Sequence, residues 1–228
     1  MTQIFDKDGN LIPVTLVEAG PCRILEVAEN PTKVKIGFGA IKESKVNKPL
    51  TGYFKKVGFA PMRTVKEFES SDNKNYTVGQ ELKADVFKAG DFVDVSGISI
   101  GKGFQGGMKR WGWEGGPAAH GSMHHRRVGS IGSSADPSRT FRGRHMPGHM
   151  GHVRSTSQGL RIMEVDVEKN LVLIKGAVPG HKNSLVEVRI SKKKAWKDLY
   201  QEKAIIKKKV NPMKQSKAKA GTASKKKG

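Results

Sequence analysis

The sequence predicts a mainly β fold, in which a β-barrel domain is interrupted by a long irregular loop and followed by a basic C-terminal tail. Three observations support this prediction. Short runs of branched residues with period-two alternation recur on both sides of a central segment. That segment is rich in glycine and shows neither helical nor strand periodicity, and the end of the chain is dominated by lysine. Many short strands separated by turns are typical of barrels and sandwiches.

The predicted strands flank the central segment on both sides. They cover residues 11–17, 22–27, 33–38, 92–100, 160–167, 171–174 and 185–190. A short helix is predicted over 49–57, a hairpin turn over 168–170, and a further short helix is compatible with 196–206. Because strands precede and follow the central segment, we expect one domain formed by 1–100 and 155–190. The loop is then 101–154, and the tail, expected to be partly disordered on its own, is 191–228.

The charge is concentrated in the loop and the tail. The formal net charge is +21, which opposes compact folding unless a polyanion neutralises it. The loop holds nine Lys and Arg against two acidic residues, and the tail holds fourteen against two. The other two segments, 1–100 and 155–190, each carry a net charge of +1. Nucleic acid is the commoner polyanionic partner and an anionic membrane the rarer one.

The composition of the loop favours burial in folded RNA over a solvated linker. It holds 13 of the 27 glycines, six of the seven histidines and two of the three tryptophans. Glycine lets the protein backbone approach RNA closely, arginine forms bidentate hydrogen bonds with phosphate, and aromatic rings stack on bases. The predicted RNA-binding residues are Lys102, Lys109, Arg110, Trp111, Trp113, His120, His124, His125, Arg126, Arg127, Ser133, Ser134, Arg139, Arg142, Arg144, His145, His149 and Arg154.

Other kinds of site have weaker support. Gly101–Gly106 matches the dinucleotide pattern G-x-G-x-x-G, but residues 107–117 are predicted not to form the helix that this motif requires. The histidines lack the Cys and His pairs at fixed spacing that are typical of structural zinc. Serines close to histidines are expected by chance in a segment of this composition, so they do not indicate a catalytic nucleophile. Paired carboxylates near apolar walls, the signature of general acid and base catalysis, are absent. We therefore expect no catalytic activity, no metal, no cofactor and no small-molecule substrate.

The remaining features indicate a cytosolic protein. Cys22 is the only cysteine, so an intrachain disulfide is excluded, and its apolar surroundings in sequence indicate a buried structural residue. No apolar run approaches the roughly 20 residues that cross a bilayer. The N-terminal residues lack the regions of a signal peptide. We expect no membrane partner.

One stretch resembles a known signature. Residues 87–110 resemble the signature sequence of the universal large-subunit ribosomal protein three family, bacterial type. The positions that carry this resemblance are Phe87, Asp94, Gly97, Ser99, Gly101, Lys102, Gly103, Gly106 and Arg110. Residues 120–122, 125–132, 146–151 and 170–180 are also similar to the family, in the same order along the chain. The likeness extends over about residues 1–190.

The resemblance implies a β-barrel domain on the subunit surface and a loop that threads the large-subunit ribosomal RNA (rRNA) toward the peptidyl transferase centre. It also implies a role in early subunit assembly and contacts with neighbouring ribosomal proteins. The tail beyond about Lys194 is longer than is usual in bacterial members. The loop tip over 133–137 has no Gln, whereas some members carry a methylated Gln there. Two alternatives remain: a non-ribosomal RNA chaperone, and a basic RNA-modifying enzyme.

Overall fold

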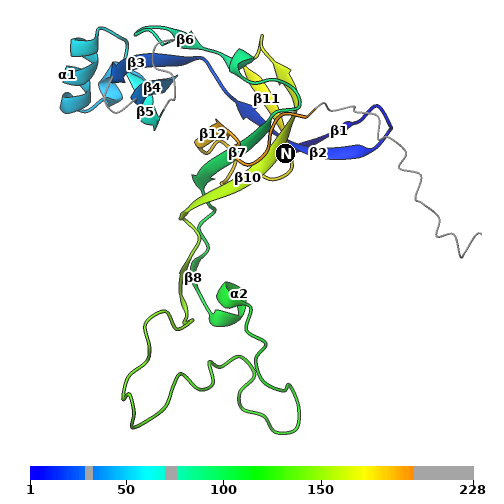
Figure 1. Cartoon of the computed structure of the whole chain (residues 1–228). Coiled ribbons are helices and arrows are strands. Elements are labelled where there is room, and N and C mark those ends of the chain that lie inside the picture. Colours follow the sequence, from blue (N-terminus) through cyan, green and yellow to red (C-terminus); the bar gives the residue numbers. More distant parts are fainter. Residues whose placement is uncertain (29–32, 70–75, 198–228) are drawn as a thin grey trace, which may run out of the picture. The chain divides into compact units, whose positions relative to one another are not determined.

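A computed structural model of the chain describes residues 1–28, 33–69 and 76–197 (Figure 1). Met1–Lys197 form one compact unit. Strands make up most of its regular structure, and all of its strand pairs are antiparallel. The mainly β class is therefore confirmed.

The larger sheet has six strands in the order β1-β2-β11-β10-β7-β12. These are β1 (Thr2–Phe5), β2 (Leu11–Glu18), β11 (Leu171–Lys175), β10 (Arg154–Asp166), β7 (Phe92–Ile98) and β12 (Val186–Ile190). Its alternating apolar residues bury one face. The centre of that core is Val93, Val95, Ile162, Val172 and Ile174, each at most 1% exposed.

The six-stranded sheet is not closed into a barrel within the described residues, because β1 and β12 form its two edges. Residues 22–40, expected in the barrel, belong to a second sheet of four strands in the order β5-β4-β3-β6. These are β5 (Met62–Glu69), β4 (Lys33–Ala40), β3 (Cys22–Ala28) and the short β6 (Glu81–Leu82). Strand patterns indicate which residues extend but not which strands they pair with, so closure was not determined by the alternation alone.

One helix accompanies the four-stranded sheet. Helix α1 (Lys48–Val57) follows the 3-10 turn η1 (Glu43–Lys45), and a second 3-10 turn, η3 (Ala84–Val86), precedes β7. Phe54 is 2% exposed and anchors α1. The helix ends at Gly58, which adopts a left-handed conformation and donates its N–H to the Phe54 carbonyl at 2.9 Å. The helix predicted over 49–57 is thus present and begins one residue earlier.

Strand β10 is the element that supports the loop. Its first half pairs with β7 and its second half with β11. The pairing with β7 is interrupted between Ser157 and Leu160, where Gly159 has a φ of 66° and donates its N–H to Asp94 Oδ1 at 2.7 Å. Asp94, a family-signature position, therefore stabilises the bulge in the strand that leads out of the loop.

The chain after β12 does not leave the sheet immediately. Ser191 donates its N–H to the Phe92 carbonyl at 2.8 Å, and Trp196 Nε1 donates to the Ala89 carbonyl at 3.1 Å. Arg161 donates to the Lys197 carbonyl at 2.8 Å. Residues 191–197 therefore pack on the larger sheet and contain no helix. The rest of the predicted tail, and most of the helix compatible with 196–206, lie outside the described residues.

Glu187 on β12 joins the two sheets. Its carboxylate lies 3.0 Å from Lys66 Nζ on β5, 2.6 Å from Arg154 Nη2 on β10 and 3.8 Å from Arg189 Nη2. The Glu187 side chain is only 12% exposed, while the three cations are about half exposed. Burial acts to raise the pKa of Glu187, but the hydrogen bond from Lys66 and the three positive charges outweigh it and lower that pKa.

We expect Glu187→Gln to lower the free energy of unfolding by about 1–2 kcal/mol, because three cations lose their counter-charge. The lowered pKa means that the carboxylate contributes fully above the ordinary glutamate pKa. Its contribution is lost as the pH falls through the lowered, folded-state pKa. Urea unfolding between pH 3 and pH 7 measures this. The difference between wild type and variant should shrink on acidification; a difference that is constant with pH would contradict the prediction.

Candidate nucleic-acid interface

The loop leaves the larger sheet as two paired legs, seen in Figure 1 running side by side from β7 and β10. Ser99 and Val153 are joined by a backbone hydrogen bond of 2.9 Å, and Lys102 donates its N–H to the Met150 carbonyl at 2.9 Å. Beyond them β8 (Gly103–Gln105) pairs with β9 (Gly148–Met150), with Gln105 opposite Gly148. The loop base is therefore a two-stranded ribbon, which the absence of alternation in the sequence did not predict.

The two legs approach each other closely at Gly151. It has a φ of 74°, and a Cβ there would overlap the carbonyl oxygen of Ile100 on the other leg. Both the backbone conformation and the close contact therefore require glycine at this position.

A single helical turn follows the outgoing leg. The prediction that residues 107–117 form no helix was wrong, because α2 (Gly107–Trp111) forms there and ends at Gly112 in a left-handed conformation. A five-residue helix is too short to show periodicity. The objection to a dinucleotide site nevertheless holds, because every strand pair in the described residues is antiparallel and no parallel βαβ unit surrounds the glycines.

Both tryptophans of the loop make contacts within the chain. The Trp111 ring stacks on His145 with centroids 3.9 Å apart and planes 3° apart, and the Arg110 guanidinium carbon lies 4.9 Å from the Trp111 centroid. Arg110 and Trp111 both donate to the Met146 carbonyl, at 2.8 and 2.9 Å. Trp113 lies against Gly107, where a Cβ would overlap its ring. Trp111 and His145 thus join the two legs at the point where the ribbon ends, whereas the contact of Trp113 with Gly107 lies within the outgoing segment.

A second backbone crossing lies farther out. Gly116 donates its N–H to the His125 carbonyl at 3.2 Å, and His125 Nδ1 lies 3.0 Å from the Pro117 carbonyl oxygen. The Arg144 guanidinium donates to the Ser130 carbonyl at 2.6 Å and so connects the returning leg to the tip. These contacts, rather than a buried core, determine the course of the loop.

The outer part of the loop is exposed and positively charged. Every residue of the buried hydrophobic core lies outside 101–154. Phe104, Met123 and Phe141 are between 64% and 79% exposed, so the loop presents large apolar side chains together with its positive charge. Eight of the nine loop cations have no ion pair with any described residue: Lys102, Lys109, Arg110, Arg126, Arg127, Arg139, Arg142 and Arg144. The ninth, Arg154, pairs with Glu187 at the sheet.

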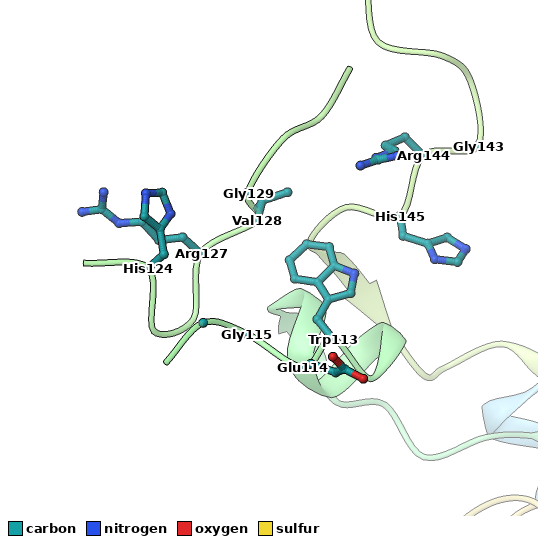
Figure 2. A pocket seen from close by; sticks show the side chains of 11 residues that line it. Trp113, Glu114, Gly115, His124, Arg127, Val128, Gly129, Gly143, Arg144 and His145 are labelled. Atoms are coloured by element: carbon teal, nitrogen blue, oxygen red, sulfur yellow. The ribbon is translucent and has the colours of Figure 1, made fainter. Parts of the chain in front are cut away.

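A hollow of about 680 Å³ opens among the loop segments. Figure 2 shows Trp113 between a group formed by His124 and Arg127 and a second group formed by Arg144 and His145. Val128, Gly129 and Gly143 also line it and were not among the predicted residues, because nothing in their side chains marks them. The combination of an aromatic ring, imidazoles and guanidiniums around an open space matches the chemistry that binds an unstacked base and its phosphate.

The remaining predicted residues lie along the exposed surface of the loop. His120, Ser133 and Ser134 are exposed on its outer part, and His149 is exposed on β9 opposite Phe104. In the part of the chain that the structure describes, no three His, Cys, Asp or Glu side chains come together as metal ligands. The described helices include none that is long and apolar enough to span a bilayer.

Comparison with known proteins identifies the family. The family model for ribosomal protein L3 matches residues 56–169, half of the chain. The large ribosomal subunit protein uL3 of Brachyspira hyodysenteriae (strain ATCC 49526 / WA1) is 48% identical over 198 residues, covering 85% of this chain and 91% of that relative. The chain belongs to the ribosomal protein L3 family. The L3 match runs from the end of α1 into the turn before β11, so it includes the entire loop.

Proposed function

We propose that this L3-family chain is a structural constituent of the large ribosomal subunit and binds large-subunit rRNA through residues 101–154. The observation that carries the proposal is the set of eight loop cations without an ion pair in the described residues, together with exposed aromatic and apolar side chains. The relative from Brachyspira hyodysenteriae is named as a large-subunit protein. The same assignment implies that the chain acts without catalysis, cofactor or metal.

The loop geometry suits insertion between RNA elements. The paired legs and the Trp111–His145 stack hold the base of the loop narrow. Arg126, Arg127, Arg139 and Arg142 then present guanidiniums to phosphates on either side of the tip. In this proposal Trp111 mainly holds the legs together, because His145 and Arg110 already lie against its ring, whereas Phe104 and Phe141 are free to contact bases.

The tip itself is small and weakly charged. Residues 128–138 contain no lysine or arginine and one acidic residue, Asp136. Such a segment can enter between closely spaced RNA elements at small electrostatic cost. By family resemblance we propose that it approaches the peptidyl transferase centre without supplying catalytic groups. We further propose, on the same basis, that the chain joins the subunit early in assembly, in the cytoplasm, beside other large-subunit proteins.

Sedimentation tests the proposal. We expect the full chain to migrate with the large subunit after a high-salt wash, and the purified chain to prefer large-subunit over small-subunit rRNA by at least about tenfold. Equal affinity for both RNAs would favour the RNA chaperone. Covalent change in an RNA substrate on addition of the protein would favour the modifying enzyme. Either result would overturn the structural role.

A further inference from the structure

The segment around α1 is strongly basic, although the first hundred residues as a whole are nearly balanced. Residues 42–63 hold six Lys and Arg and one Glu. The remaining part of 1–100 holds eight Lys and Arg and twelve acidic residues. A charge averaged over a hundred residues therefore conceals a local positive region that is distinct in sequence from the loop.

The cations of this region differ from those of the sheet beside it. On the sheet, Arg23 pairs with Glu81, Lys35 with Glu26, and Lys66 with Glu187. The cations around α1 are all exposed and form no ion pair with any residue that the structure describes: Lys42, Lys45, Lys48, Lys55, Lys56 and Arg63. Their charge is available to a partner outside the chain.

Three of these lysines lie on one face of α1. Lys48 and Lys55 are seven residues apart, and Lys56 is four residues after Gly52, so the four residues fall within about a third of the helix circumference. Phe54, which is buried, points to the opposite side. We call the surface formed by Lys48, Gly52, Lys55 and Lys56 the α1 face.

Among the residues that the structure describes, none gives Gly52 a role that accounts for it. It lies in the middle of a helix, where glycine is less stable than alanine because of its larger loss of backbone entropy. Its φ is not in the left-handed region, and a Cβ added to it would meet no atom within 4 Å from the rest of the described residues. Neither backbone conformation nor packing requires glycine, so close approach of an external partner is the remaining physical reason for it.

We propose that the α1 face binds the sugar–phosphate backbone of a second rRNA segment, separate from the RNA that surrounds the loop. The proposal rests on the proposed rRNA-binding function and extends it to a new site. Unpaired lysines supply point charges for phosphates, and Gly52 lets a backbone strand lie directly on the helix. The face has no aromatic or amide side chain with which to distinguish bases, so the contact is to backbone rather than to sequence.

Charge-matched variants of the full chain test the site. The α1 variant is Lys48→Gln, Lys55→Gln and Lys56→Gln; the control is Lys83→Gln, Lys88→Gln and Lys182→Gln, three exposed lysines elsewhere with no ion pair in the described residues. On large-subunit rRNA, we expect the α1 variant to reduce the slope of log affinity against log salt by about 2, at roughly 0.7–0.9 per phosphate. The control should reduce it by less than about 1.

Hydroxyl-radical footprinting locates the effect. In the α1 variant one rRNA segment should lose protection while the segments protected by the loop remain protected. In Gly52→Ala the same segment should lose protection and affinity should fall several-fold, although the helix becomes more stable and the melting temperature rises. A fall in affinity together with a rise in stability would not follow from a purely structural role of Gly52.

The outcomes separate the site from the general function. If the α1 variant matches the control in salt slope and footprint, the α1 face does not bind RNA. If RNA binding is unchanged but the variant enters subunits poorly, the partner is an acidic protein surface and the proposal is overturned. If the wild-type chain shows no preference for large-subunit rRNA, the proposed function itself fails, whatever the α1 variant does.

Discussion

Replacing residues 106–147 with an Asn-Gly turn is expected to lower the affinity for large-subunit rRNA by at least about 100-fold, because seven cations and the tip are removed. The shortened protein should still unfold in one cooperative transition. Gln105 and Gly148 lie directly opposite each other in the ribbon, so a two-residue turn closes it without moving either leg. The residues of the buried hydrophobic core all lie outside the deleted segment.

Truncation after Lys197 is the matched control for this excision, because it removes more positive charge and leaves the packed Trp196 in place. We expect the truncation to flatten the salt dependence while the preference for large-subunit rRNA persists. The excision should abolish that preference. Circular dichroism with urea unfolding and filter binding at several salt concentrations measure both properties. Loss of cooperative unfolding in the excised protein would show that the loop is part of the folded core. Loss of preference only in the truncated protein would show that the loop is not the principal RNA anchor.

Gly151→Ala is expected to weaken rRNA binding by about tenfold with the sheet intact. The new Cβ would overlap the Ile100 carbonyl oxygen, and the left-handed backbone costs a non-glycine residue roughly 1–2 kcal/mol. The legs must therefore separate, which displaces everything beyond them. The strain should appear mainly in the loop because the core contains no residue of the legs.

Gly101→Ala provides the comparison for Gly151→Ala. Gly101 lies on the opposite leg with an ordinary backbone conformation, and its added Cβ would lie 3.5 Å from His152, a normal contact. Its rRNA affinity should remain close to that of wild type. Amide hydrogen exchange at the leg hydrogen bond from Lys102 to Met150 should accelerate only in Gly151→Ala. Equal affinities for the two variants would mean that the separation of the legs does not control binding.

Several parts of this fold were predictable from local sequence because their physical cause is local. Residues 11–17, 92–100 and 171–174 are rich in branched apolar side chains, and each range contains a strand of the larger sheet. Strand β1 was not predicted, because its sequence Thr-Gln-Ile-Phe is two polar residues followed by two apolar ones and does not alternate. Strand β5 was not predicted because its charged residues lie in an exposed strand that pairs with β4 on one side only.

The roles of single residues in the interface were less predictable. Trp111 and Trp113 were predicted to contact RNA, and the structure places them against His145 and Gly107. Arg154 was predicted to contact phosphate and is paired with Glu187 across the sheet. In each case the partner lies more than five residues away along the chain or lacks a side chain, so no local pattern marks it. The α1 face was not predicted for a different reason: its charge is cancelled by acidic residues elsewhere in the first hundred residues.

By itself the sequence determined the mainly β fold class, the position of the long loop and the segments where positive charge accumulates. These are properties of composition and short-range periodicity, and they suffice to indicate a polyanionic partner. Only the tertiary structure decided that the larger sheet stays open, that a ribbon and the Trp111–His145 stack hold the loop, and which cations remain unpaired. Those features depend on contacts between residues far apart in the chain, and a linear pattern carries no information about which distant groups neutralise or cover one another.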